Sequence, residues 1–158
     1  MSDDTAREIL VEGARALAHV DGLESSLQAL IDGVSERLEI GSVVIAGADP
    51  DQPGILVSVG LDDVARAGLS RAIGNPAHPI PRTAATRIAT FDVLPTVPGG
   101  PALRSHLPLV VTRNGSEAVL GVLALAYDRP LDEPTRSVLT AIADLAAVAI
   151  EMSRLGRG

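Results

Sequence analysis

The sequence contains no cysteine, no lysine and no tryptophan, and only one phenylalanine and one tyrosine. The absence of cysteine excludes disulfides, thiolate zinc sites and cysteine nucleophiles. The absence of lysine excludes Schiff-base catalysis and a phosphate-binding P-loop. Because pockets for flat cofactors are usually walled by aromatic side chains, we expect no cofactor.

The chain also lacks a run of about 18 apolar residues, and its first residues are acidic rather than basic. We therefore expect neither a membrane span nor a secretory signal, and we predict a cytoplasmic protein. The net charge of −7 argues against a nucleic-acid partner, because phosphates are bound by basic surfaces. A chain of 158 residues is expected to form a single domain, residues 1–158.

Apolar residues at helical spacing predict three long helices, at residues 4–20, 23–38 and 132–154. Asp132 is in the N-cap position of the last one. That helix is apolar on more than one side, which is more surface than a single sheet can cover. An interface between helices of two subunits would bury it, so we expect a homodimer formed through the terminal helices, with residues 1–22 as a dimer or signalling helix.

Strands are predicted at residues 42–46, 55–59, 88–91, 105–112 and 118–127. Asn114-Gly115 predicts a tight hairpin between the last two, because a type I′ turn needs positive φ at both positions. Residues 118–127 are apolar at every position, which indicates a strand covered on both faces in the middle of a sheet.

Between these strands lies a proline-rich segment, residues 75–101, which holds six of the eleven prolines. A short helix from Asp62 or Asp63 to about residue 73 precedes it, and a helical turn is predicted at 82–87. We expect the rest of the segment to be irregular.

The order of these elements resembles the GAF domain family. The resemblance is carried by Arg104-Ser105-His106-Leu107-Pro108-Leu109, by the strand around Gly121, and by the ending at 145–151. It implies an α+β fold with a central antiparallel sheet. The N- and C-terminal helices would pack on one face, and the irregular, proline-rich cover with its short helices would lie over the other. Family members hold small ligands between the sheet and this cover.

Several family activities do not fit the residues present. The free methionine-(R)-sulfoxide reductases and the bilin-binding members depend on cysteines, so both are excluded. The cyclic-nucleotide signature fails because Pro76 follows Asn75 and Pro95 stands four residues after Phe91. Haem-binding members carry a histidine shortly before the arginine that corresponds to Arg104, and residues 99–103 contain none. Haem is retained as a minor alternative through His78 or His106.

The resemblance places the ligand-binding residues at the cover, and we predict the site to be His78, Arg82, Phe91, Asp92 and Arg104. Val44 and Leu123 are expected to line it from the sheet. Because arginine reads carboxylates and phosphates bidentately, an anionic ligand is favoured. In the alternative interpretation, Arg82 is solvated, Arg104 pairs with Asp92, and His78 is a loop-fixing hydrogen bonder. His106 is expected to be a hydrogen-bonded strand residue.

The carboxylates stand at turns and helix starts, where capping explains them, so we expect neither a metal site nor enzymatic activity. Two functions remain. One is a sensor domain that binds an unidentified small molecule and signals through its terminal helices. The other is a dimerisation or protein-docking module with a collapsed pocket. Either would act through a separate output protein or a missing C-terminal output domain.

Overall fold

The computed structural model describes residues 1–19, 22–48, 54–94 and 103–156. The helices are α1 (Asp3–His19), α2 (Leu23–Leu38), α3 (Asp63–Ala72), α4 (Pro79–Thr86) and α5 (Glu133–Gly156). The strands are β1 (Ser42–Gly47), β2 (Gly54–Val59), β3 (Thr90–Val93), β4 (Leu103–Arg113) and β5 (Ser116–Tyr127). They form one sheet in the order β2-β1-β5-β4-β3, in which every neighbouring pair is antiparallel.

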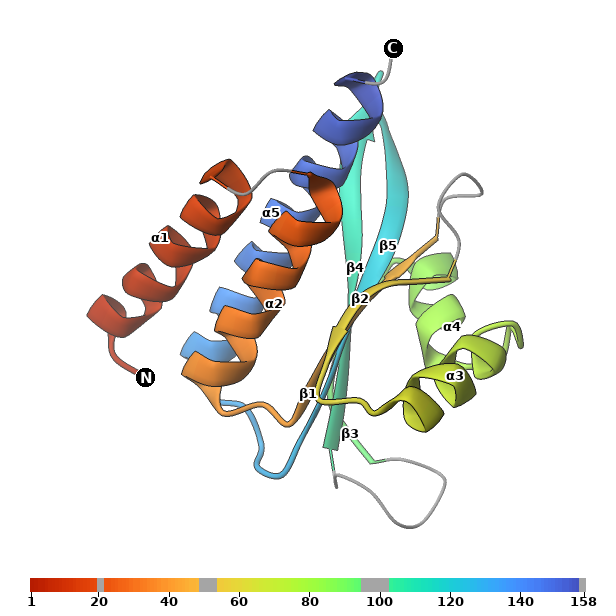
Figure 1. Ribbon diagram of the computed structural model, residues 1–158, viewed down its shortest axis with the longest axis horizontal. Helices are drawn as coiled ribbons and strands as arrows, with labels where there is room; N and C mark the ends of the chain where they lie inside the picture. Colours follow the sequence, from red (N-terminus) through yellow and green to blue (C-terminus); the bar gives the residue numbers. More distant parts are fainter. Residues whose placement is uncertain (20–21, 49–53, 95–102, 157–158) are drawn as a thin grey trace.

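Helices cover both faces of this sheet (Figure 1). On one face α2 and α5 pack on the strands, and α1 packs outside them against both helices. On the other face α3 contacts β2, and α4 contacts β4 and β5. The α+β architecture expected from the sequence is therefore confirmed, with α1 as an outer layer rather than a direct neighbour of the sheet.

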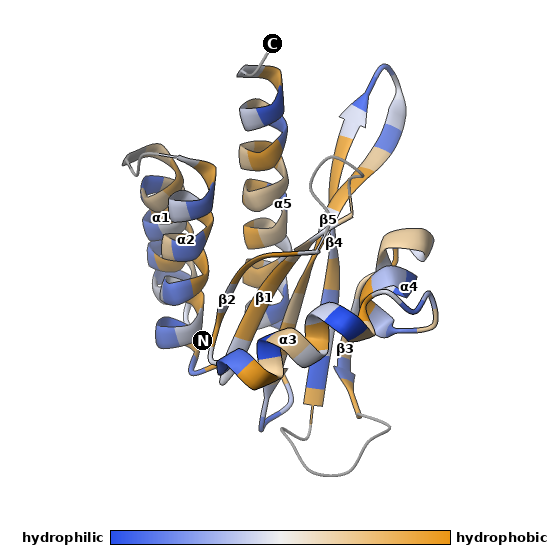
Figure 2. Ribbon diagram, turned by 45° about the vertical axis from the view of Figure 1, so that its right-hand side comes forward, coloured by the Kyte–Doolittle hydropathy of each residue, from blue (hydrophilic) through white to orange (hydrophobic). Residues whose placement is uncertain are grey.

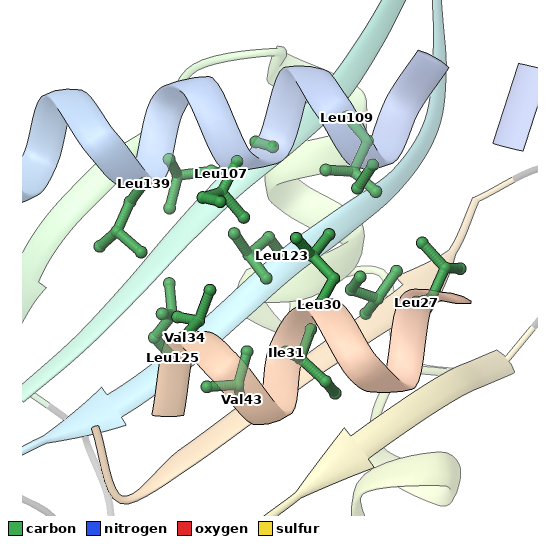
Figure 3. Packing of buried hydrophobic residues seen from close by; sticks show 14 of the residues in the cluster. Leu27, Leu30, Ile31, Val34, Val43, Leu107, Leu109, Leu123, Leu125 and Leu139 are labelled. Carbon is green, nitrogen blue, oxygen red and sulfur yellow. The ribbon is translucent and has the colours of Figure 1, made fainter. Parts of the chain in front are cut away.

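The main core lies between the sheet and the helices α2 and α5. Leu30 of α2, Leu139 of α5, Leu107 of β4 and Leu123 of β5 are almost fully buried there and point toward one another (Figure 3). Each such side chain contributes roughly 1.5–3 kcal/mol on burial. The middle parts of the central strands are correspondingly coloured as hydrophobic, whereas the hairpin end of β4 and β5 is hydrophilic (Figure 2). This core holds the sheet in place. The site described below lies on the other face of the sheet, which α3 and α4 cover.

Local signals in the sequence set several boundaries as expected. Asn114 and Gly115 have φ of 50° and 81° and join β4 to β5. The side chain of Asp132 accepts a 2.9 Å hydrogen bond from the backbone N–H of Thr135 and so caps α5. The placement of residues 118–127 at the middle of the sheet is also confirmed, since β5 lies between β1 and β4.

The proline-rich segment is more regular than expected. Its helix begins at Pro79, not at residue 82, because proline at the first helical position has its φ already fixed. The helix ends at Arg87, which has a left-handed conformation with φ of 60°. The strand that follows is Thr90–Val93, two residues later than expected. The predictions for residues 95–101 lie outside the described residues.

No helix in the described part of the chain is long and apolar enough to cross a membrane.

Candidate ligand-binding cavity

A cavity of about 530 Å³ lies between the sheet and the pair α3 and α4. Its floor is made by strand residues that share one face. Arg104 and His106 of β4 are paired with Ala126 and Ala124 of β5, and Val44 of β1 is paired with Ala124 from the other side. Because alternate residues of a strand point to the same face, Arg104 and His106 both lie toward the cavity. We call it the basic cavity.

Arg104 brings a permanent positive charge to this cavity. Its Nε is buried and has no hydrogen-bond partner, and the guanidinium forms no ion pair with any described carboxylate. The described lining contains no Asp or Glu. A buried donor on a charged group is costly when left unpaired, so the cavity favours an anion that accepts from it.

The alternative pairing of Arg104 with Asp92 is wrong. Asp92 lies at an irregularity in the β3–β4 pairing with φ of 55°, and its carboxylate accepts a 2.6 Å hydrogen bond from Arg136 of α5 instead. Its other oxygen accepts from the Tyr127 hydroxyl at 2.6 Å. The side chain of Asp92, whose backbone is left-handed, thus lies on the side of the sheet covered by α5, away from Arg104.

His106 lines the basic cavity although it was not among the predicted ligand-binding residues. This residue is only 5% exposed, and no hydrogen bond joins its ring to a side chain or backbone group of the described residues, so the expectation of a hydrogen-bonded histidine stays a prediction. Burial, assisted by the charges of His78 and Arg104, lowers the pKa of His106 to about 4. The signal available in the sequence was its spacing, because a residue two positions after Arg104 on a strand shares its face.

His78 stands at the start of α4 and also lines the basic cavity. Its Nδ1 accepts a 3.1 Å hydrogen bond from the backbone N–H of Ile80 and so caps the helix. Burial and the nearby charge of Arg104 lower the pKa of His78, which favours the neutral ring. With Nδ1 acting as an acceptor, the neutral ring carries its proton on Nε2 and can donate it.

This tautomer bears on the haem alternative. A ligating imidazole nitrogen must be unprotonated, whereas the hydrogen bond at Nδ1 leaves the proton of His78 on Nε2. The described lining of the cavity also has no Phe, Tyr or Trp that could stack on a flat macrocycle. The residues present therefore do not fit haem held by His78.

The other predicted site residues lie elsewhere. Arg82 is exposed and absent from the described lining. The ring of Phe91 lies 5.0 Å from the guanidinium carbon of Arg136, on the same side of the sheet as Asp92. Leu123 is buried in the main core, so its expected place in the lining is wrong, whereas that of Val44 is right. Ligand binding by any of these residues stays a prediction.

A second cavity of about 610 Å³ lies on the same face of the sheet, between α4 and the far parts of β1 and β5. It is lined by Ala46, Ile73, Ala84, Val119 and Val122 among others, and no charged side chain of the described residues contributes to it. We call it the apolar cavity. Ile80 of α4 lines both cavities.

Metal binding finds no support in the described residues. Residues 1–19, 22–48, 54–94 and 103–156 bring together no group of three His, Asp or Glu side chains that could hold a metal ion. The chemistry of the basic cavity is therefore that of one guanidinium, two imidazoles and the serine at position 42 around an otherwise apolar lining.

Comparisons with known proteins identify the fold. No family model and no curated protein matches the sequence. Solved structures do match. The GAF domain of a phosphoenolpyruvate-protein phosphotransferase from Coxiella burnetii superimposes with a TM-score of 0.78 at 15% identity, covering 98% of each chain. The GAF domain of the corresponding Acinetobacter protein gives 0.72 at 16% identity, over 98% of this chain and 97% of that one.

A third neighbour is an enzyme. The free methionine-R-sulfoxide reductase of Neisseria meningitidis, solved with its substrate, gives a TM-score of 0.76 at 17% identity, over 99% of this chain and 95% of that one. At these identities the likeness establishes the shared fold and leaves the activity to be argued from the residues of this chain.

Proposed function

Because this chain has the fold of GAF domains, we propose that it is a non-enzymatic sensory or regulatory domain that binds a small organic anion in the basic cavity. The carboxylate or phosphate of the ligand accepts hydrogen bonds from Arg104, with His78 and His106 beside it. Occupancy is passed to a separate output protein or output domain through the terminal helices.

One observation carries this proposal. Arg104 lines a cavity of about 530 Å³ with a buried, unpaired Nε and with no carboxylate in the described lining. A domain without a ligand would gain by pairing or replacing such a group, whereas a binding site keeps it free for the ligand.

The same cavity weighs against the docking-module alternative, which requires side chains to fill the space under the cover. A volume of about 530 Å³ lies within the range of small-molecule sites and far exceeds that of one water. The lack of cysteine supports a role other than that of the reductase with which the fold is shared, because that chemistry depends on thiols.

The test is a screen of small carboxylates and phosphate monoesters by thermal unfolding and titration calorimetry. Wild-type protein is compared with Arg104→Gln, and Arg71→Gln serves as the control because it removes the same charge from an exposed position of α3 outside the described lining. A ligand at a hundred times its Kd adds about 2.7 kcal/mol to stability. We expect that gain in wild-type and R71Q protein and not in R104Q. Equal responses of all three proteins to every ligand would refute the proposal.

The oligomeric part of the proposal is a homodimer formed through the terminal helices. An apolar groove of about 520 Å³ lies between α1, α2 and α5, lined by Leu17, Leu23, Leu145, Val148 and Met152 among others. Val148, Met152 and Leu155 are more than half exposed and follow one another at helical spacing along α5. A second copy of the same helix presents a matching apolar stripe around a twofold axis.

A further inference from the structure

The two cavities on the cover face are neighbours along the same two strands. β1 contributes Val44 to the basic cavity and Ala46 to the apolar one, while β5 contributes Ala124 to the first and Val122 to the second. These are successive cover-facing pairs of the β1–β5 ladder, Val44 with Ala124 and Ala46 with Val122. The cavities therefore follow one another over the sheet without a strand between them.

Ile80 stands at the boundary. Its side chain is 5% exposed, packs with Ala46 and Val122, and lines both cavities. Its backbone N–H is held by the ring of His78, which lines the basic cavity. The residue that the two described linings share therefore has a flexible aliphatic side chain.

Polarity changes sharply across this boundary. The basic side has Arg104, His78 and His106, whereas no charged side chain of the described residues lines the other side. The five residues of β5 from Ala126, opposite Arg104, to Val122 span about 13 Å. One elongated molecule with an anionic end and an aliphatic end matches this gradient, whereas a small, uniformly polar anion would leave the apolar cavity unused.

We propose that the ligand is an amphipathic anion whose charged headgroup is held by Arg104 in the basic cavity and whose aliphatic chain passes Ile80 into the apolar cavity. This inference rests on the proposed function and adds the chemical class of the ligand. The headgroup fixes position and the chain supplies affinity, because each buried methylene contributes about 0.8 kcal/mol, a factor of about four in Kd.

The experiment measures Kd by titration calorimetry for straight-chain carboxylates, ethanoate, butanoate, hexanoate and octanoate, and for the matching alkyl phosphates. We expect Kd to fall about fourfold for each added methylene in at least one series, and to level off once the chain fills the apolar cavity. The series that responds identifies the headgroup.

Variants separate the two ends of the ligand. Arg104→Gln is expected to weaken binding of every member by a similar factor and to leave the chain-length dependence intact. Ala84→Leu, which narrows the apolar cavity, is expected to reduce the gain beyond butanoate while short anions bind as before. Ser70→Leu narrows the same cavity from an exposed position of α3 and serves if A84L does not fold. Ala67→Leu adds the same side chain on α3 outside both described linings and should behave as wild type.

The outcomes distinguish this inference from the function on which it rests. Binding that depends on Arg104 but not on chain length refutes the amphipathic ligand and leaves the anion site standing. A chain-length gain that persists undiminished in both A84L and S70L places the chain elsewhere, such as the groove between α1, α2 and α5, and also refutes the inference. If no anion of either series binds, the proposed function and this inference both fail.

Discussion

The carboxylate of Asp92 on β3 and the guanidinium of Arg136 on α5 form a 2.6 Å hydrogen-bonded ion pair that ties the sheet edge to the first turns of the C-terminal helix. The same carboxylate accepts from the Tyr127 hydroxyl and from the backbone N–H of Leu131. Burial acts to raise the pKa of Asp92, but the hydrogen bonds from Tyr127, Arg136 and Leu131 outweigh it and leave the pKa lowered. Asp92 is thus a structural residue of this fold.

Replacing Asp92 by Asn should destabilise the protein by about 2 kcal/mol, because the charge that accepts these hydrogen bonds is lost while the donors stay partly buried. Urea unfolding measures the effect. Glu8→Gln is the matched control, since it removes a carboxylate from an exposed pair with Arg37 and should have a much smaller effect on stability. An equal loss in the two variants would contradict the structural role assigned to Asp92.

Arg104→Gln should leave the stability of the ligand-free protein unchanged or raise it by about 1 kcal/mol. The reason is that a guanidinium with a buried, unpaired Nε costs desolvation energy that no partner among the described residues returns. Urea unfolding without added anions measures this effect. A marked loss of stability would mean that Arg104 is needed for the fold, and the argument for an anion site would lose its main support.

Acidification should destabilise the protein through His106. Its folded pKa of about 4 lies below the ordinary value of 6.5, so the unfolded state binds a proton first as the pH falls. The stability that His106 contributes is complete above pH 6.5, declines between 6.5 and about 4, and is lost below that; this loss is on the order of 3 kcal/mol. Urea unfolding of wild-type and His106→Gln protein at about pH 7 and about pH 4 tests this sign.

In His106→Gln the pH dependence should shrink but not vanish, because the pKa of His78 is lowered as well. If the wild-type protein became more stable over the same interval, the burial of a neutral imidazole at position 106 would be wrong.

Gly60 should tolerate no side chain. It joins β2 to α3 with φ of 83°, and a Cβ there would lie 1.9 Å from the carbonyl oxygen of Gly41. Gly60→Ala should therefore cost at least about 4 kcal/mol, since backbone must move on both sides. Gly33→Ala in α2 is the contrasting variant, because nothing lies within 4 Å of its added Cβ; it should gain about 0.5–1 kcal/mol. Thermal unfolding of both variants measures the difference.

Met152→Glu should convert a dimer into a monomer, because it places a charge in the apolar stripe of α5, where Met152 is 67% exposed. Sedimentation velocity measures the state of assembly. Val64→Glu on α3 is the control, since Val64 is an exposed apolar residue on the opposite side of the sheet. A wild-type monomer, or a dimer that persists in M152E, would refute the interface through the terminal helices.

The sequence predicted the fold well because its signals were local and unambiguous. Asn114-Gly115 specifies a tight turn wherever it stands between strands, and an apolar strand such as β5 has no stable place except the middle of a sheet. The helix 23–38 was predicted to the residue for the same reason, since its apolar face repeats at helical spacing without interruption.

The site was predicted less well because it depends on which face a residue occupies. His78 and Arg104 do line the basic cavity, but Asp92 faces the other side owing to a left-handed backbone at one residue. The left-handed conformation of Asp92 could not be predicted from the sequence, since aspartate adopts it only occasionally. His106 was underestimated for the opposite reason: a histidine on a strand usually finds a hydrogen-bond partner, and here the described residues supply none.

The cap of α4 makes the cover itself sensitive to protons. The hydrogen bond from Ile80 to Nδ1 of His78 exists only while that nitrogen keeps its lone pair. Protonation of Nδ1 turns this acceptor into a donor, so acid would break the hydrogen bond that caps α4. The protonated ring would also place a second positive charge beside Arg104. Acidification would thus strengthen the electrostatic attraction of an anion to the basic cavity and at the same time loosen the helix that covers it. The anion would enter more readily and would also leave more readily.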